Sequence, residues 1–126
     1  MNADSYREVA RLARDWVRGL FPRPIRAPDI SRIRAGVGLY LACQAGGQLH
    51  YIGSVVRPND SRGIAKRISQ HPRKVRAKWW LLWVLPLRDD TPRNVVLSIE
   101  GQAIDLLNPP GNRRKHFPRA VPFRKE

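Results

Sequence analysis

Two tyrosines that flank a diglycine turn are the first residues whose types and spacing suggest chemistry. Tyr40 ends a Gly-Leu-Tyr tripeptide, Tyr51 begins a Tyr-Ile-Gly tripeptide, and Gly46-Gly47 lies between them. If these two glycines are the central residues of a tight hairpin turn, Tyr40 faces Gly53 on the partner strand. Side chains alternate along a strand, so both phenols are expected on one face, about 7–8 Å apart as diagonal neighbours. The glycine and alanine residues around them would leave room for a ligand.

The opposite face of this hairpin is predicted to be apolar. The residues expected there are Leu39, Leu41, Cys43 and Ile52. His50 is predicted to point to the same face as a structural histidine. Cys43 is the only cysteine, which excludes an intrachain disulfide and a cysteine-rich zinc site, and it is interpreted as a small core residue.

Two further polar residues lie on the next predicted element. Residues 61 to about 70 have helical spacing and are followed by Pro72, which stops a helix. Arg67 and His71 are four residues apart, so both are expected on one face of this helix, beside a row of isoleucines.

A carboxylate interrupts the apolar stripe of the last predicted helix. Val96, Glu100, Ala103 and Leu107 follow one another at intervals of four, three and four residues. A buried carboxylate costs several kcal/mol unless it is paired with a cation or binds a metal ion. Glu100 therefore needs a partner, and the sequence favours an arginine and a metal ion equally.

The composition predicts a polyanionic partner. The 126 residues include 24 lysines and arginines against 10 acidic residues, a formal net charge of +14, and 19 of the cations are arginines, whose planar fork suits phosphate. No apolar run approaches the roughly 20 residues of a transmembrane helix. The N-terminus carries an arginine-studded helix rather than an apolar signal segment. We therefore expect no membrane partner, no secretion, and a location in the bacterial cytoplasm or nucleoid.

The chain length fits one domain of the α/β (α+β) class. An amphipathic helix is predicted from Ser5 to about Leu20, and a proline-rich linker that wraps the domain follows to Arg34. The run from Trp79 to Leu85 predicts a strand buried on both faces, whose tryptophans are interpreted as core residues. Base stacking is the alternative for these rings, and Trp79 or Trp80 at the edge of the strand could serve both purposes.

The polar residues, taken together, resemble in order and spacing the GIY-YIG nuclease family. The residues that carry the resemblance are Gly38, Leu39, Tyr40, Tyr51, Ile52, Gly53, Ser54, Arg67, His71, Glu100 and Asn112. The match spans about residues 36 to 114, and Leu39 stands where the family name has isoleucine. The resemblance implies a small three-stranded antiparallel sheet flanked by helices. The domain organisation expected is an N-terminal helix and linker at 1–34, a nuclease domain at 35–114 and a basic tail at 115–126.

The resemblance also implies metal-dependent hydrolysis of DNA phosphodiester bonds. Glu100 would be the one direct protein ligand of a single Mg²⁺ or Mn²⁺ ion, and Arg67 would bind the phosphate. Tyr40 would be the general base, with Tyr51 holding the water or a phosphate oxygen. His71 is the competing base, because the pKa of a histidine is better matched to neutral pH. The supporting residues expected are Gly38, Gly53, Ser54 and Asn112, whose amide would anchor the local backbone.

A set of basic residues around this site is expected to contact DNA. Its members are Arg57, Arg62, Lys66, Arg73, Lys74, Arg113, Arg114 and Lys115. One hydrolytic centre cuts one strand at a time, so a homodimer or a recruiting protein partner is an additional expectation. Repair, restriction and mobile-element roles stay open. The alternative function is a catalytically silent nucleic-acid-binding or assembly module on the same fold.

Overall fold

The structure is a computed structural model that describes residues 1–112. The expected tail at 115–126, with Arg113 and Arg114 before it, lies outside the described residues. The elements in chain order are α1 (Ala3–Ala13), the 3-10 helix η1 (Arg14–Trp16), β1 (Ile25–Arg26), the 3-10 helix η2 (Ala27–Arg32), β2 (Val37–Cys43), β3 (Leu49–Val56), α2 (Gly63–Ser69), α3 (Arg73–Arg76), β4 (Leu81–Pro86) and α4 (Arg93–Leu107).

The strands form one antiparallel sheet in the order β1-β4-β2-β3. The prediction of an antiparallel sheet flanked by helices is confirmed, but the number of strands is wrong. The fourth strand, β1, comes from the linker and pairs Ile25 with Leu82 and Arg26 with Leu81. It was missed because a two-residue strand between prolines has no periodicity to detect.

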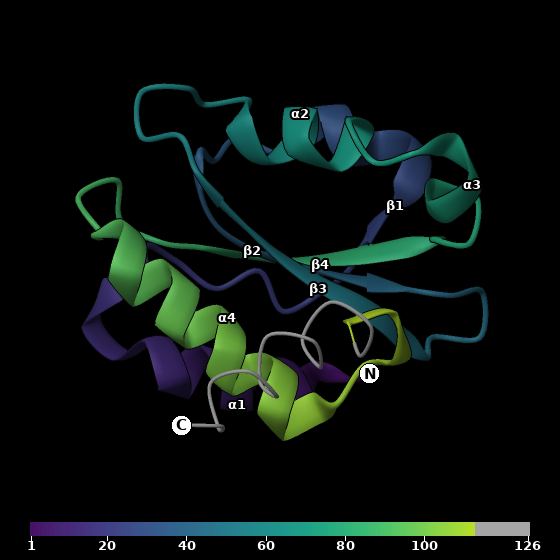
Figure 1. The fold of residues 1–126 in the computed structure, drawn as a ribbon, viewed down its shortest axis with the longest axis horizontal. Coiled ribbons are helices and arrows are strands. Elements are labelled where there is room, and N and C mark those ends of the chain that lie inside the picture. The colour runs from purple at the N-terminus through teal and green to yellow at the C-terminus, as the bar shows by residue number, and fades with distance from the viewer. Residues whose placement is uncertain (113–126) are drawn as a thin grey trace, which may run out of the picture.

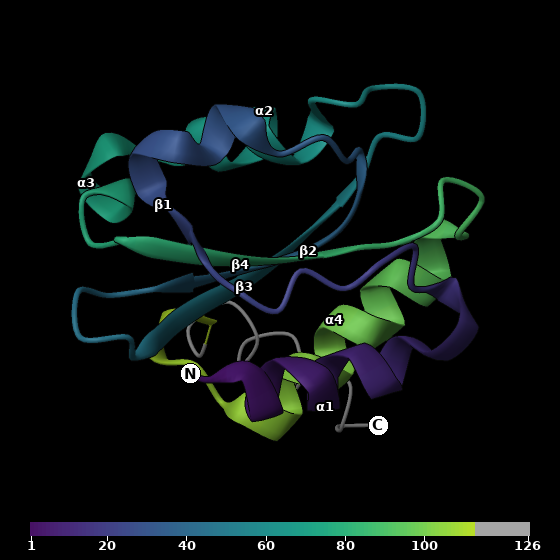
Figure 2. The ribbon, with the colours of Figure 1, turned by 180° about the vertical axis from the view of Figure 1, so that it is seen from behind.

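Helices cover both faces of the sheet (Figure 1). The helices α1 and α4 lie on one face, and α2 and α3 lie on the other, as the reverse view also shows (Figure 2). Two apolar clusters result. The first contains Leu39, Leu41, Cys43 and Ile52 with residues of α1 and α4. The second contains Tyr40, Ala42 and Tyr51 with residues of α2. The predicted division of the hairpin into a leucine face and a tyrosine face is therefore confirmed.

The N-terminal helix is shorter than expected. It begins after Asn2, whose side chain accepts a hydrogen bond from the Ser5 backbone N–H, and it ends at Ala13. The next residue, Arg14, has a φ of 49°, which turns the chain out of the helix. Tyr6 is fully buried at the sheet, where its hydroxyl donates to the Val84 carbonyl at 2.7 Å and accepts from the Phe21 N–H at 2.9 Å.

The β2–β3 hairpin reaches the predicted register by an unpredicted route. Gln44 pairs with Gln48 around a three-residue loop in which Gly47 has a φ of 88°, so Gly46-Gly47 is not a two-residue turn. A β-bulge between Ala42 and Cys43 then adds one residue to β3. The two departures cancel, and Tyr40 faces Gly53 as predicted.

The tryptophans of the predicted strand divide into two groups. Trp79 and Trp83 are buried, as predicted, with 4% and 6% of their surface exposed. Trp80 is 61% exposed, so its interpretation as a core residue is wrong. The strand begins only at Leu81, and Trp80 precedes it at the end of this interior strand.

Candidate active site

Four rings meet on the tyrosine face of the sheet. The centroids of Tyr40 and Tyr51 lie 6.2 Å apart, and the Tyr51 ring stacks on Trp79 at 5.6 Å with 22° between the planes. The His71 ring contacts all three, at 5.9 Å from Tyr40, 5.2 Å from Tyr51 and 4.8 Å from Trp79. This ring cluster is the centre of the candidate site.

The ring cluster fills a face that was expected to be open. Tyr40 exposes only 1% of its surface, and Tyr51 and His71 expose 7% each. The expectation of free space beside both tyrosines is therefore wrong at Tyr40. Small residues on the hairpin do not leave a void here, because His71 and Trp79 supply the missing volume from the segment that follows α2.

Gly53 is the residue that makes the position of Tyr40 possible. A Cβ atom at Gly53 would lie 2.3 Å from the Tyr40 Cζ and hydroxyl oxygen, so the ring rests directly on the glycine backbone. Gly38 likewise allows a close approach, here between the backbones of β2 and β4. Its φ is 155°, and a Cβ atom there would lie 2.4 Å from the Leu85 carbonyl oxygen of β4. Both predicted supporting glycines thus occupy positions that a larger residue would disturb.

Tyr40 and His71 are hydrogen bonded. The Tyr40 hydroxyl lies 2.6 Å from the His71 Nε2, and the contact is buried. The prediction that His71 shares a helical face with Arg67 is wrong, because α2 ends at Ser69 and is capped at Gln70. The histidine lies after the helix, and Pro72 follows it. Leaving the helix is what turns its ring toward Tyr40.

The pKa of Tyr40 reports which charges surround it. Burial is the main cause that raises this pKa above the usual value, and Tyr51 raises it further. The Arg67 guanidinium lowers it, and the Glu100 carboxylate raises it. Arg67 comes from α2 and Glu100 from α4, so the two helix layers bring their charged groups within electrostatic reach of one phenol. A phenol is protonated at neutral pH even at its usual pKa, and the raised pKa strengthens this preference.

Glu100 is half-buried in α4 at the edge of the sheet formed by β3. Ser54, directly after the Tyr-Ile-Gly tripeptide, donates its hydroxyl to Glu100 Oε1 at 3.0 Å. Val96, Ile99 and Ala103 are the buried positions of α4, so the carboxylate stands beside the apolar stripe rather than inside it. That position lets it meet both the sheet and solvent.

Asn112 holds the same edge strand. Its Oδ1 accepts from the Ile52 N–H at 2.7 Å, and its Nδ2 donates to the Ile52 carbonyl at 2.8 Å. The buried side chain therefore pairs with β3 as a further backbone strand would. It fixes the strand at a residue between Tyr51 and Gly53.

His50 and Trp79 belong to the site and were not assigned to it from the sequence. Trp79 donates its indole N–H to His50 Nδ1 at 3.1 Å, so the expectation that His50 points to the leucine face is wrong. The bulge places Leu49 against the leucine-face cluster and frees His50 to reach the other side. No sequence pattern predicted this orientation of His50, because a bulge inserts one residue without changing the residue types around it.

The predicted DNA contacts lie on the segment that carries α2 and α3. Arg62, Lys66, Arg73 and Lys74 are exposed, and Arg57 is half-buried. Lys66 forms an ion pair with Asp60 at 2.9 Å, and Arg57 donates to Gln70 Oε1 at 3.1 Å. Residues 57–78 hold eight lysines and arginines and a single acidic residue, Asp60. The positive charge of the described chain is therefore concentrated next to the ring cluster.

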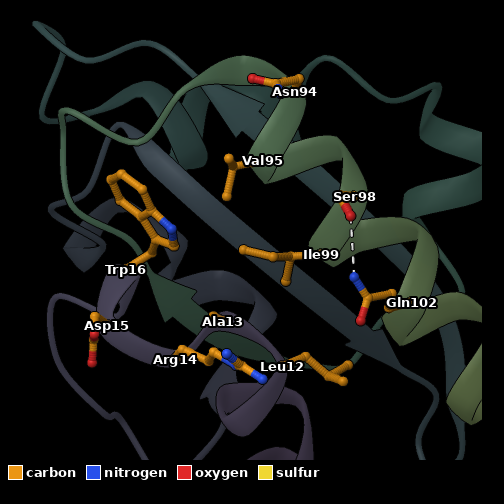
Figure 3. A pocket seen from close by; sticks show the side chains of 10 residues that line it. All are labelled: Leu12, Ala13, Arg14, Asp15, Trp16, Asn94, Val95, Ser98, Ile99 and Gln102. Carbon is orange, nitrogen blue, oxygen red and sulfur yellow. Dashed lines mark hydrogen bonds between the residues drawn. The ribbon is translucent and has the colours of Figure 1, made fainter.

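A separate cavity of about 360 Å³ lies on the opposite face, between the α1–η1 segment and α4 (Figure 3). Trp16 and Ile99 point into it, and Gln102 donates to Ser98 at its rim. The Arg88 guanidinium lies 5.5 Å from the centre of the Trp16 ring. The cavity contains none of the residues predicted to form the site.

The described residues contain no group of three or more histidine, cysteine, aspartate and glutamate side chains that could hold a metal ion. The predicted site needs only one such ligand, because Mg²⁺ keeps most of its bound waters and is often held by one or two carboxylates. The half-buried Glu100 carboxylate fits that role. In residues 1–112 no helix is long and apolar enough to cross a membrane.

Comparison with models of known protein families found no match to this chain, and comparison with curated protein sequences found none either.

Proposed function

We propose that the protein is a metal-dependent DNA endonuclease with a fold of the GIY-YIG type. The observation that carries the proposal is the convergence on Tyr40: its hydroxyl contacts His71, and the charges of Arg67 and Glu100 act on it. A buried phenol that is hydrogen bonded to a histidine and lies within electrostatic reach of a guanidinium and a carboxylate is typical of an active site. The concentration of positive charge beside them supports DNA as the substrate.

The residues of the chain divide the work of phosphodiester hydrolysis. Arg67 binds the scissile phosphate and stabilises the negative charge that develops on its oxygens. Tyr40 removes a proton from the attacking water. Because its raised pKa keeps Tyr40 protonated, its own hydroxyl proton needs an acceptor, and His71 Nε2 lies at hydrogen-bond distance. The two candidate bases then act as one unit, with Tyr40 next to the water and His71 behind it.

Glu100 would hold the metal ion, and the Ser54 hydroxyl orients the carboxylate. When bound, a divalent ion supplies Lewis-acid stabilisation of the phosphate and the leaving oxygen. Tyr51, stacked on Trp79, positions the water or a phosphate oxygen. Asn112 keeps the strand that carries Tyr51 in place.

The replacement Glu100→Gln tests the proposal. Glutamine keeps an oxygen for the Ser54 hydroxyl but binds Mg²⁺ weakly, so we expect DNA affinity to persist while Mg²⁺-dependent cleavage falls by about two orders of magnitude or more. The measurement is nicking and cutting of linear, nicked, flapped, branched and single-stranded DNA across divalent metals. Asp105→Asn is the matched control, since it removes one carboxylate from the exposed side of the same helix.

The second candidate is a catalytically silent nucleic-acid-binding module. The burial of Tyr40 favours it, because His71 and Trp79 cover the phenol that would have to meet the water. Both candidates predict binding that weakens steeply with salt. They differ in cleavage alone: if the wild-type protein nicks no DNA with any metal in that screen, the nuclease proposal is wrong and the binding module stands.

A further inference from the structure

Trp80 is the most exposed large apolar side chain of the described residues. It exposes 61% of its surface, against 43% to 49% for Leu20, Phe21, Leu97 and Leu106. A tryptophan that is left in water forfeits the free energy that burial of its ring would supply. Tryptophan is enriched at binding surfaces, where a partner covers the exposed ring.

Backbone hydrogen bonds on both sides hold Trp80 at the end of the interior strand β4. Its N–H donates to the Cys43 carbonyl at 2.8 Å, and its carbonyl accepts from the Ala27 N–H at 2.9 Å. The preceding residue, Trp79, is part of the ring cluster, with its ring 6.4 Å from that of Tyr40. Trp80 thus directly follows, in the chain, a residue of the ring cluster.

Positive charge surrounds this tryptophan along the chain. Arg73 and Lys74 are exposed on α3, which precedes β4 at the same end of the sheet (Figure 1), and Lys78 is exposed two residues before Trp80. Within residues 1–112 these three side chains form no ion pair. Lys78 also lies near the ring cluster, because its charge adds to burial in lowering the pKa of His50. An exposed ring among uncompensated cations is complementary to a base flanked by phosphates.

We propose that Trp80 stacks on an unpaired base and that Arg73, Lys74 and Lys78 bind the adjoining phosphates, so that the substrate is DNA with a single-stranded segment next to the cleavage site. In a duplex both faces of each base are already covered by neighbouring bases, and exposing one breaks stacking and pairing contacts. An unpaired base offers its face without that cost. This inference rests on the proposed function, since it names the substrate class of the same site.

The test compares two oligonucleotides on one protein background. Glu100→Gln protein, which should not cut, is titrated in Mg²⁺ with fluorescent oligothymidine and with a blunt duplex of equal length. We expect Trp80→Ala to raise the Kd for oligothymidine about fivefold or more, because base–aromatic stacking contributes about 1–3 kcal/mol, and to change the duplex Kd less than twofold. Trp80→Phe should keep most of the affinity, since it keeps an aromatic face. Leu97→Ala, an exposed apolar residue on α4, should change neither Kd.

Two outcomes would overturn the inference: an unchanged Kd for oligothymidine in Trp80→Ala, or an equal loss on oligothymidine and duplex. An unchanged Kd would leave a protein partner as the explanation of the exposed ring. The cleavage screen separates this inference from the proposed function. If Trp80→Ala loses oligothymidine binding but wild-type protein cuts nothing, the stacking surface is established and the nuclease proposal alone fails.

Discussion

At the scale of single residues, the candidate site depends on one phenol held against a glycine. Tyr40 packs on Gly53, bonds to His71 and is influenced by Arg67 and Glu100. The tyrosine cannot shift without losing its relation to at least one of these groups. Its position should therefore matter as much as its chemistry.

The replacement Gly53→Ala probes that position without removing a reactive group. The new methyl group would overlap the Tyr40 ring, so the ring must move, and we expect cleavage to fall by about two orders of magnitude. Gly101→Ala is the matched control, because no atom lies within 4 Å of a Cβ there and alanine favours a helix by about 1 kcal/mol. Cleavage rates and melting temperatures of both variants are the measurements. Wild-type activity in Gly53→Ala would mean that the contact does not place Tyr40.

The buried tyrosines predict loss of stability in alkali. Burial raises the pKa of Tyr6 and of Tyr40 in the folded protein, whereas the unfolded chain ionises near pH 10. Because the unfolded state then releases protons that the folded state retains, the free energy of unfolding is unaffected below about pH 10 and falls as the pH rises above it. Thermal melts from neutral pH to about pH 11 measure the effect. Tyr6→Phe should flatten the alkaline slope, although it should cost about 1–3 kcal/mol at pH 7 by leaving buried partners unsatisfied.

At the scale of elements, the site depends on the contact between β3 and α4. The strand carries Tyr51, Gly53 and Ser54, and the helix carries Glu100. The Ser54–Glu100 hydrogen bond connects the two elements. Asn112 fixes the strand from its free side through Ile52.

The replacement Asn112→Ala tests this edge contact. It removes two hydrogen bonds and leaves the Ile52 N–H and carbonyl without their partner, so we expect a loss of about 2 kcal/mol in the free energy of unfolding. Asn94→Ala, at an exposed position of α4, should change stability by less than about 0.5 kcal/mol. Urea denaturation measures both variants. Equal stability of the two would show that the amide does not hold the strand.

The hairpin shows what the sequence could and could not predict. Alternation of apolar and small residues was enough to assign the two faces of β2 and β3, because burial of the leucine side selects the register. The loop and the bulge could not be predicted, since each adds or removes one residue at little local cost. Their effects cancel before Tyr51, which is why the tyrosine pair was predicted correctly and His50 was not.

The other site residues also separate into those that the sequence could predict and those that it could not. The spacing of α4 indicated an unusual carboxylate at Glu100, because a 3.6-residue period is visible in fifteen residues of helix. The place of His71 depends on where a seven-residue helix stops and on how Pro72 redirects the chain. Helix ends are determined by tertiary contacts that a local pattern does not contain, so its bond to Tyr40 could be found only in the folded molecule.

At the scale of the whole molecule, charge is distributed unevenly over the two sides of the sheet. Within residues 1–112, segment 57–78 carries most of the excess positive charge, whereas α1 balances Arg7 and Arg11 with Asp4 and Glu8. The candidate active site lies on the strongly basic side. DNA should therefore approach from that side.

Charge reversal on that side should weaken binding in a salt-dependent way. We expect the double variant Arg73→Glu and Lys74→Glu to raise the Kd for duplex DNA and to reduce the slope of log Kd against log salt by about one to two, because each lost phosphate contact removes about 0.9 from the slope. Arg93→Glu, at the start of α4, is the control on the other side and should leave the slope nearly unchanged. Equal effects of the two variants would indicate non-specific attraction by net charge.

The short strand β1 has a consequence for how the molecule meets copies of itself. The two outer strands of a sheet carry backbone groups that can recruit a strand from another chain and start intermolecular sheet growth. Here one outer strand is only two residues long, and the other has Ile52 already paired by Asn112. The segment before residue 35 thus covers the outer side of β4 and prevents another chain from adding a strand there. A fragment lacking it would present β4 as a six-residue template for strand exchange, and such a fragment should aggregate where the full chain stays dispersed.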